Sequence, residues 1–160
     1  MYHIRPIQSA DDPRIAAIIR ANLEAYWLDI PGTAYFDPEL DHLSRYYGAE
    51  PDRRAYFILE DDQSQVLGGV GVAEFSGLDA CAELQKLYLT DGLKGRGLGR
   101  RLLERAEDAA RTLGYRRLYL ETHSALVPAL RLYEAAGFTR IAQPETVLHT
   151  TMDRFYLKEL

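Results

Sequence analysis

The sequence is poor in the residues that support redox or metal chemistry. Its 160 residues include one cysteine, Cys81, and only two methionines. A single cysteine cannot form an internal disulfide, and no Cys or His spacing resembles that of a zinc site. We therefore expect Cys81 to be a small residue within a strand, and we expect no metal cofactor.

The sequence also has no excess of basic residues. Nineteen Lys and Arg stand against 24 Asp and Glu, which gives a net charge of −5. Nucleic-acid binders normally carry a basic surface, so the charge argues against a nucleic-acid partner. No apolar run approaches the length that crosses a membrane, and the start of the chain has no signal-peptide pattern. We expect a cytoplasmic protein without a membrane partner.

The length and the hydrophobic fraction of 47% suit an ordinary globular domain. We expect residues 1–160 to form a single α/β domain. Alternating apolar residues predict strands at 2–7, 55–60, 66–75, 80–89 and 116–121, with further strands between about 147 and 160. Helical spacing predicts helices that start near Asp12, near Asp37, after the glycines at 95–99, and before Pro128.

This order, β-α-α-β-β-β-α-β-α-β-β, predicts a mixed sheet of six or seven strands flanked by about four helices. The strand at 83–89, the helix after it and the strand at 116–121 form a β-α-β unit, so these two strands should be parallel. The glycines at 68, 69 and 71 predict a bulge or a close backbone approach.

The most informative segment is the loop at 94–100, Lys-Gly-Arg-Gly-Leu-Gly-Arg, between a strand and an amphipathic helix. Glycines at alternate positions allow a tight turn and present bare N–H groups. A helix N-terminus favours an anion, so the loop is suited to a diphosphate. The spacing fits neither the G-x-G-x-x-G dinucleotide pattern nor the P-loop of nucleotide triphosphate enzymes.

Two other segments accompany the loop in a fixed order. Residues 83–89 read Glu-Leu-Gln-Lys-Leu-Tyr-Leu, and residues 132–138 read Leu-Tyr-Glu-Ala-Ala-Gly-Phe. Together with the loop they resemble the central strand, the [QR]-x-x-G-x-[GA] loop and the L-Y-x-x-x-G-F motif of the GNAT superfamily of N-acetyltransferases. The resemblance is specific over residues 66–140, and Lys94 stands where the family usually has Gln or Arg.

The resemblance implies the GNAT fold and transfer of an acetyl group from acetyl-CoA to an amine. Acetyl-CoA would bind where the strands at 83–89 and 116–121 diverge. The implied pyrophosphate site consists of Lys94, Gly95, Arg96, Gly97, Leu98, Gly99 and Arg100, with Arg101 nearby. Backbone groups of Leu87, Tyr88 and Leu89 would hold the thioester arm. Leu126 stands where the family often has Asn, and Ser124 is expected to replace part of that contact.

The resemblance also suggests catalytic roles. Tyr133 matches the family tyrosine that acts as general acid, and a phenol with a pKa near 10 is protonated at neutral pH. The general base stays open between Glu83 and His123, and many family members rely on water alone. We expect Glu121 and His123, at the end of the neighbouring strand, to face the same cleft, and Thr122 or Ser124 to cap the helix that follows.

The acceptor should bind between the first two strands, where aromatic and acidic residues alternate: Tyr26, Trp27, Asp29, Tyr35, Phe36, Asp37, Asp41, Tyr46 and Tyr47. Aromatic rings with carboxylates suit a cationic small-molecule amine. Tyr26 and Tyr47 are expected in the helix core. A protein acetyltransferase, a non-catalytic acyl-CoA-binding module and a structural domain remain as alternatives. The acyl group, the acceptor and the oligomeric state stay open, and a homodimer is compatible with the sequence.

Overall fold

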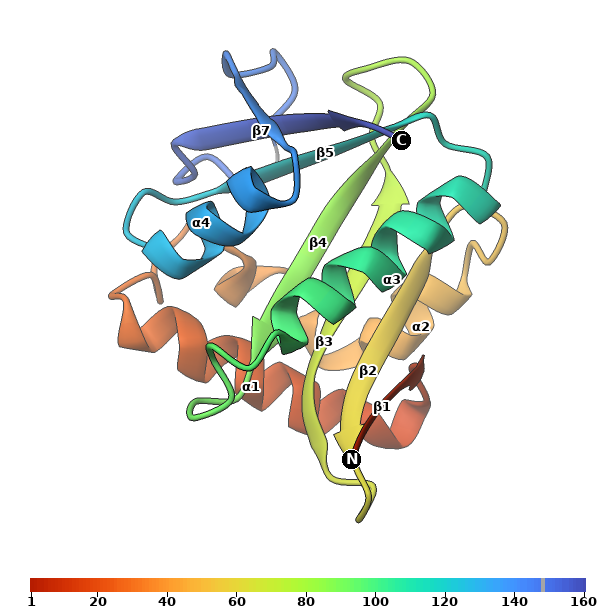
Figure 1. Cartoon of the computed structure of the whole chain (residues 1–160). Helices are drawn as coiled ribbons and strands as arrows, with labels where there is room; N and C mark the ends of the chain where they lie inside the picture. The colour runs from red at the N-terminus through yellow and green to blue at the C-terminus, as the bar shows by residue number, and fades with distance from the viewer. Residues whose placement is uncertain (148) are drawn as a thin grey trace.

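The computed structural model describes residues 1–147 and 149–160, which form a seven-stranded sheet in the order β1-β2-β3-β4-β5-β7-β6 (Figure 1). The strands are β1 (Tyr2–Pro6), β2 (Ala55–Asp61), β3 (Val66–Glu74), β4 (Cys81–Leu89), β5 (Arg117–Thr122), β6 (Thr139–Ile141) and β7 (Arg154–Glu159). Only the β4–β5 pair is parallel among the pairs of this sheet. The predicted mixed sheet and the predicted parallel pair are confirmed.

Helices cover both faces of the sheet (Figure 1). They are α1 (Asp12–Ala25), α2 (Leu43–Gly48), α3 (Leu98–Thr112) and α4 (Val127–Ala135). Helices α1 and α2 pack on one face, and α3 and α4 pack on the other. Among the described residues, no helix combines the length and apolar character needed to cross a membrane.

The apolar stripe of α3 explains its position on the sheet. Leu102, Leu103 and Ala106 are at most 1% exposed and contact β2, β3 and β4, whereas Arg100 and Glu104 face solvent. Each buried leucine contributes about 1.5–3 kcal/mol by leaving water. Because α3 follows the glycine loop directly, this packing also fixes where the loop lies relative to β4.

Two predicted boundaries are wrong. The helix expected from Asp37 begins only at Leu43, because the Asp37 carboxylate binds Lys86 and His149 instead of capping a helix. The C-terminal return was expected from about residue 147, whereas β6 already begins at Thr139 and β7 starts at Arg154. Residue 148, within that predicted segment, lies outside the described residues.

The parallel strands β4 and β5 pair over only three residues. Cys81, Ala82 and Glu83 face Arg117, Leu118 and Tyr119. Beyond Glu83, β4 continues to pair with β3 on its other side, but it pairs with no described strand on the β5 side. The two strands therefore separate at the point where the sequence predicted that they diverge.

A bulge in β4 lies next to this separation. Gly71 pairs with Gln85 and Gly69 pairs with Tyr88, so Lys86 and Leu87 together face Val70. Lys86 has a φ of 51°, which is uncommon for a residue with a side chain. Because of the extra residue, the Gln85 and Lys86 side chains both lie on the α1–α2 face of the sheet. In a regular strand these two neighbouring side chains would lie on opposite faces.

The glycines of β3 make room for two tyrosines beneath the bulge. A Cβ atom on Gly69 would lie 2.5 Å from a ring carbon of Tyr56, and one on Gly71 would lie 2.6 Å from the Tyr47 hydroxyl oxygen. The Tyr56 hydroxyl donates a hydrogen bond to the Lys86 carbonyl at 2.9 Å. The bulge and the close approach predicted from these glycines are both present.

We predict that Gly71→Ala destabilises the protein by about 1–3 kcal/mol, because the new methyl group forces Tyr47 aside. Urea unfolding measures the change. Gly48→Ala is the control: Gly48 ends α2, and a Cβ there meets no atom within 4 Å. That substitution should be neutral or stabilise by up to about 1 kcal/mol. Equal effects at both positions would contradict the steric explanation.

Candidate active site

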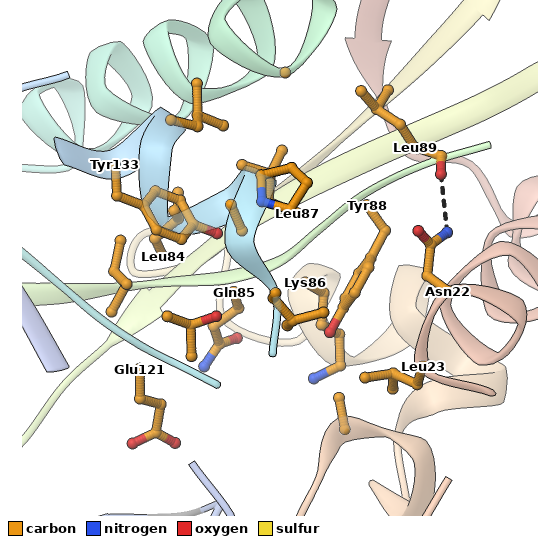
Figure 2. Close-up of a pocket in the computed structure, with 18 of the residues that line it drawn as sticks. Asn22, Leu23, Leu84, Gln85, Lys86, Leu87, Tyr88, Leu89, Glu121 and Tyr133 are labelled. Carbon is orange, nitrogen blue, oxygen red and sulfur yellow. Dashed lines mark hydrogen bonds between the residues drawn. The ribbon is translucent and has the colours of Figure 1, made fainter. Parts of the chain in front are cut away.

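A cavity of about 340 Å³ occupies the space between the separated strands (Figure 2). Its walls come from β4, β5, α1, α4, the glycine loop and the segment before β7. Predicted residues in the lining are Glu83, Leu87, Tyr88, Leu89, Lys94, Gly95, Gly97, Gly99, Arg100 and Tyr133. One cavity thus brings together the predicted catalytic and binding segments.

The glycine loop forms one end of this cavity. Gly95 and Gly97 have φ angles of 80° and 75°, and Gly97 is the N-cap of α3. A residue with a Cβ is strained in this left-handed conformation, so glycine is needed at both positions. The first amides of a helix have no partner within the helix. The loop therefore presents N–H groups and the positive end of the helix dipole to an anion.

The basic side chains of the loop lie in different directions. Arg100 lines the cavity and pairs with Glu104 at 2.9 Å. Arg96 donates to the Tyr2 hydroxyl at 3.3 Å and Arg101 donates to the Tyr2 carbonyl at 3.1 Å, so both reach toward β1 and neither lines the cavity. The Leu98 side chain is buried in the core. Arg100 and the loop backbone thus face the cavity, whereas the Arg96 and Arg101 side chains do not.

The end of β4 forms the middle of the cavity. Leu87 and Leu89 pack with the α3 side of the sheet, and Tyr88 packs with the α1 side. Figure 2 shows Asn22 of α1 beside this strand, where its side-chain amide donates to the Leu89 carbonyl at 2.8 Å. Asn22 was not predicted, because nothing in a helix sequence indicates which distant carbonyl its side chain will meet.

Tyr133 projects from α4 with its hydroxyl toward the cavity (Figure 2). It is 7% exposed, and its ring packs against Phe138. Burial, followed by the nearby Tyr88 phenol, raises the pKa of Tyr133 above its usual value of 10. The phenol is therefore protonated at neutral pH and has a proton that it can donate.

Glu83 lies where the two strands separate and is 3% exposed. Gln85 donates a hydrogen bond to its Oε1 at 2.6 Å, and its buried Oε2 accepts none from a described residue. Burial and then the charge of Glu121 raise the pKa of Glu83 to about 7. A carboxyl group with this pKa can take up and release a proton near neutral pH.

His123 and Ser124 lie outside the cavity lining. The His123 Nδ1 accepts a hydrogen bond from the Ala125 amide at 3.0 Å, and the Ser124 hydroxyl donates to Asp153 at 2.8 Å. The chain turns away after Thr122, and Leu126, not Thr122 or Ser124, is the N-cap of α4. The prediction that His123 faces the cleft is therefore wrong, whereas Glu121 does line it.

A buried ionic network closes the other end of the cavity. His149 Nε2 lies 2.8 Å from Asp37 Oδ1, and His149 Nδ1 lies 3.3 Å from Glu121 Oε1. Lys86 Nζ lies 2.7 Å from Asp37 Oδ2. This network joins β4, β5, the α1–α2 connection and the segment before β7. Within the described residues, no group of three or more His, Cys, Asp or Glu side chains is arranged to hold a metal ion.

His149 is a cation in this network. Burial lowers its pKa, but hydrogen bonds to Asp37 and Glu121 outweigh burial and raise the pKa to about 9. Burial raises the pKa of Asp37, yet the neighbouring His149 and Lys86 outweigh burial and hold this pKa below the usual range. An imidazole that is already protonated cannot accept a proton, so His149 is not a general base at neutral pH.

The aromatic residues of the expected acceptor region differ in their surroundings. Tyr47 is 2% exposed and belongs to the core, as expected. Tyr26 was also expected in the core, but it is half-buried and lines the cavity, 5.5 Å from Lys94 Nζ. Trp27 and Phe36 are exposed. None of Trp27, Tyr35, Phe36 and Tyr46 lines the cavity, so Tyr26 is the aromatic residue of this region that a ligand there would meet.

Similarity to known proteins identifies the family of this chain. Residues 20–138 match the Acetyltransferase (GNAT) family. The uncharacterized N-acetyltransferase YjgM of Escherichia coli (strain K12) is 37% identical over 140 residues, which cover 86% of this chain and 82% of that protein. The chain therefore belongs to the GNAT family of acetyltransferases.

Solved structures share the fold. A GNAT-family acetyltransferase of Staphylococcus aureus Mu50 superposes with a TM-score of 0.86 at 15% identity and covers 99% of both chains. A phosphinothricin acetyltransferase of Sinorhizobium meliloti, solved in complex with acetyl-CoA, has a TM-score of 0.77 at 20% identity over 99% of this chain and 88% of that one. At these low sequence identities, the superpositions show that the fold is shared, and they show nothing more.

We predict that His149 stabilises the protein in a pH-dependent way. Its folded pKa of about 9 exceeds the ordinary value of 6.5, so its contribution is complete below pH 6.5 and is lost as the pH rises through 9. The difference in unfolding free energy between the parent and His149→Gln should be about 2–3 kcal/mol near pH 6 and should decrease toward pH 10. Urea unfolding at several pH values measures it. The exposed His42, changed to Gln, is the control for the loss of a histidine outside the network.

Proposed function

We propose that this GNAT protein transfers an acetyl group from acetyl-CoA to a small primary amine by direct attack of the amine on the thioester. One observation carries the proposal: the separation of β4 and β5 surrounds a single cavity with the glycine loop, the Tyr133 hydroxyl and the Glu83 carboxyl. Acetyl-CoA in the structure of the Sinorhizobium relative supports the choice of acetyl donor.

The cavity suits the chemistry of this donor. The loop at Gly95–Arg100 offers N–H groups and a cation to the pyrophosphate. Leu87, Leu89 and Leu132 supply an apolar wall for the pantetheine arm, and the open edge of β4 supplies backbone groups for its amides. When bound, acetyl-CoA supplies an activated acyl carbonyl.

The residues around the cavity then have separate tasks. Glu83 takes the proton that the amine nitrogen loses as the N–C bond forms. Backbone N–H groups at the end of β4 stabilise the negative charge that develops on the acyl oxygen, an effect of a few kcal/mol. Tyr133 donates a proton to the sulfur as the C–S bond breaks, so that the products are an amide and a free thiol.

Two joined segments border the acceptor end, which favours a small molecule over a protein chain. Thr151 donates from its hydroxyl to the Pro31 carbonyl at 2.7 Å and from its amide to the Gly32 carbonyl at 3.1 Å. Together with the bond between His149 and Asp37, these contacts join the segment before β7 to the α1–α2 connection. An extended peptide would need an open groove where these two segments meet.

Free-thiol release from acetyl-CoA with a panel of amines, amino acids, polyamines and peptides tests the proposal. We predict turnover with a small amine and a loss of about 10²-fold in kcat for Tyr133→Phe, because the general acid is removed. The KM for acetyl-CoA should change little. Thermal stabilisation by acetyl-CoA without turnover on any amine would instead favour a non-catalytic acyl-CoA-binding module.

We further predict that Gly97→Ala weakens binding of CoA by about tenfold or more, since the added Cβ disfavours the left-handed turn that aims the loop amides. Calorimetric titration with CoA measures the loss. Gly92→Ala is the matched control. Gly92 also has a positive φ, 86°, and free space for a Cβ, but it does not line the cavity. Both variants should lose similar stability, and only Gly97→Ala should lose affinity.

A further inference from the structure

A chain of three hydrogen-bonded side chains lies at the reaction end of the cavity. The Tyr47 hydroxyl of α2 donates to the Gln85 Oε1 at 2.6 Å, and the Gln85 Nε2 donates to the Glu83 Oε1 at 2.6 Å. Tyr47 is 2% exposed and Glu83 is 3% exposed. The chain thus reaches the carboxyl group to which we assign the proton from the amine.

The direction of each hydrogen bond is determined by the groups involved. A carboxylate only accepts, so the side-chain amide of Gln85 must present its NH₂ group to Glu83. Its carbonyl oxygen then faces Tyr47, which must donate. The Glu83 carboxylate therefore sets the orientation of the Gln85 amide, and the Tyr47 hydroxyl stabilises that orientation by donating to the amide oxygen. Gln85 satisfies one oxygen of Glu83, while Oε2 has no described partner.

We propose that Tyr47 and Gln85 are positioning residues that hold Glu83 in the form that accepts a proton, with Oε2 free for the transfer. This proposal rests on the proposed function. Neither Tyr47 nor Gln85 belongs to the glycine loop or to the tyrosine motif at 132–138. Glu83 and Gln85 lie two residues apart on β4 and so share one face of the sheet, and the close approach of Tyr47 at Gly71, the partner of Gln85, brings the Tyr47 hydroxyl to Gln85.

The surroundings of Glu83 show why a neutral donor matters. Cys81 and Lys86 lie nearby on its own strand, Tyr119 and Glu121 on β5, Tyr47 on α2 and His149 before β7. Burial and Glu121 favour the protonated carboxyl, whereas Gln85, His149 and Lys86 favour the carboxylate. Removing the Gln85 donor should therefore raise the pKa of Glu83 above its value of about 7.

Carbon-13 NMR of protein labelled at Glu side chains measures this titration directly, and Glu83→Gln identifies the signal. A hydrogen bond to a charged group corresponds to a shift of about one to two pH units, which we expect as an upward shift in Gln85→Leu. Tyr47→Phe should shift the titration in the same direction by less, because the Gln85 amide is then free to turn its oxygen toward Glu83. Tyr115→Phe, which loses a hydroxyl bond to the Arg53 carbonyl far from the cavity, should cause no shift.

The kinetic arm uses the amine identified by thiol release. The acid limb of kcat/KM should move up by the same amount in each variant, and activity should return at higher pH. A merely structural role would lower the rate equally at all pH values. An unchanged Glu83 titration in folded Gln85→Leu and Tyr47→Phe overturns the proposal, and so does a shifted titration with an unshifted rate profile.

The two arms separate this proposal from the proposed function. If the parent protein acetylates no amine, the proposed function fails, and the NMR titration still decides whether Tyr47 and Gln85 control the protonation of Glu83. If Glu83→Gln keeps full activity with an amine, Glu83 is not the base, and the positioning role is overturned while acetyl transfer stands.

Discussion

The short pairing of β4 with β5 is the constraint on which the rest of the site depends. Three residues on each strand hold the sheet together, and the strands then separate. The separation leaves backbone N–H and C=O groups at the edge of β4 that, in a continuous sheet, would form hydrogen bonds with the neighbouring strand. It also creates the space in which α4, the glycine loop and the segment before β7 meet, so fold and cavity have one origin.

The bulge beside this separation determines which side chains reach the acceptor end. It places Gln85 and Lys86 on the same face, each with a different kind of partner. Lys86 joins the ionic network through Asp37, whereas Gln85 offers a neutral amide to Glu83. A carboxylate paired with cations holds its charge and is a poor proton acceptor, while one that meets a neutral donor can titrate near pH 7.

Features of the sequence that act locally predicted the structure well. The glycine loop, the amphipathic α3 and the β-α-β unit depend on neighbouring residues, and all appear as expected. The ionic network of Lys86 and His149 was not predicted, because its contacts depend on the bulge and on segments far apart in the chain. His123 was predicted in the cleft because it follows the end of the predicted strand, but the chain turns away after Thr122 and the His123 ring accepts a hydrogen bond from the Ala125 amide. A lysine within an apolar strand was the one signal that could have indicated a buried ion pair.

Three acidic groups near the acceptor end thus differ in their partners, and their partners decide what each can do. Asp37 meets two cations and keeps its charge, so it serves to join segments. Glu121 binds the backbone and ring of His149. Only Glu83 combines deep burial, a neutral donor and an oxygen without a described partner. The ionic network therefore positions the walls of the cavity and leaves proton transfer to Glu83, since a group can exchange protons near neutral pH only if no cation fixes its charge.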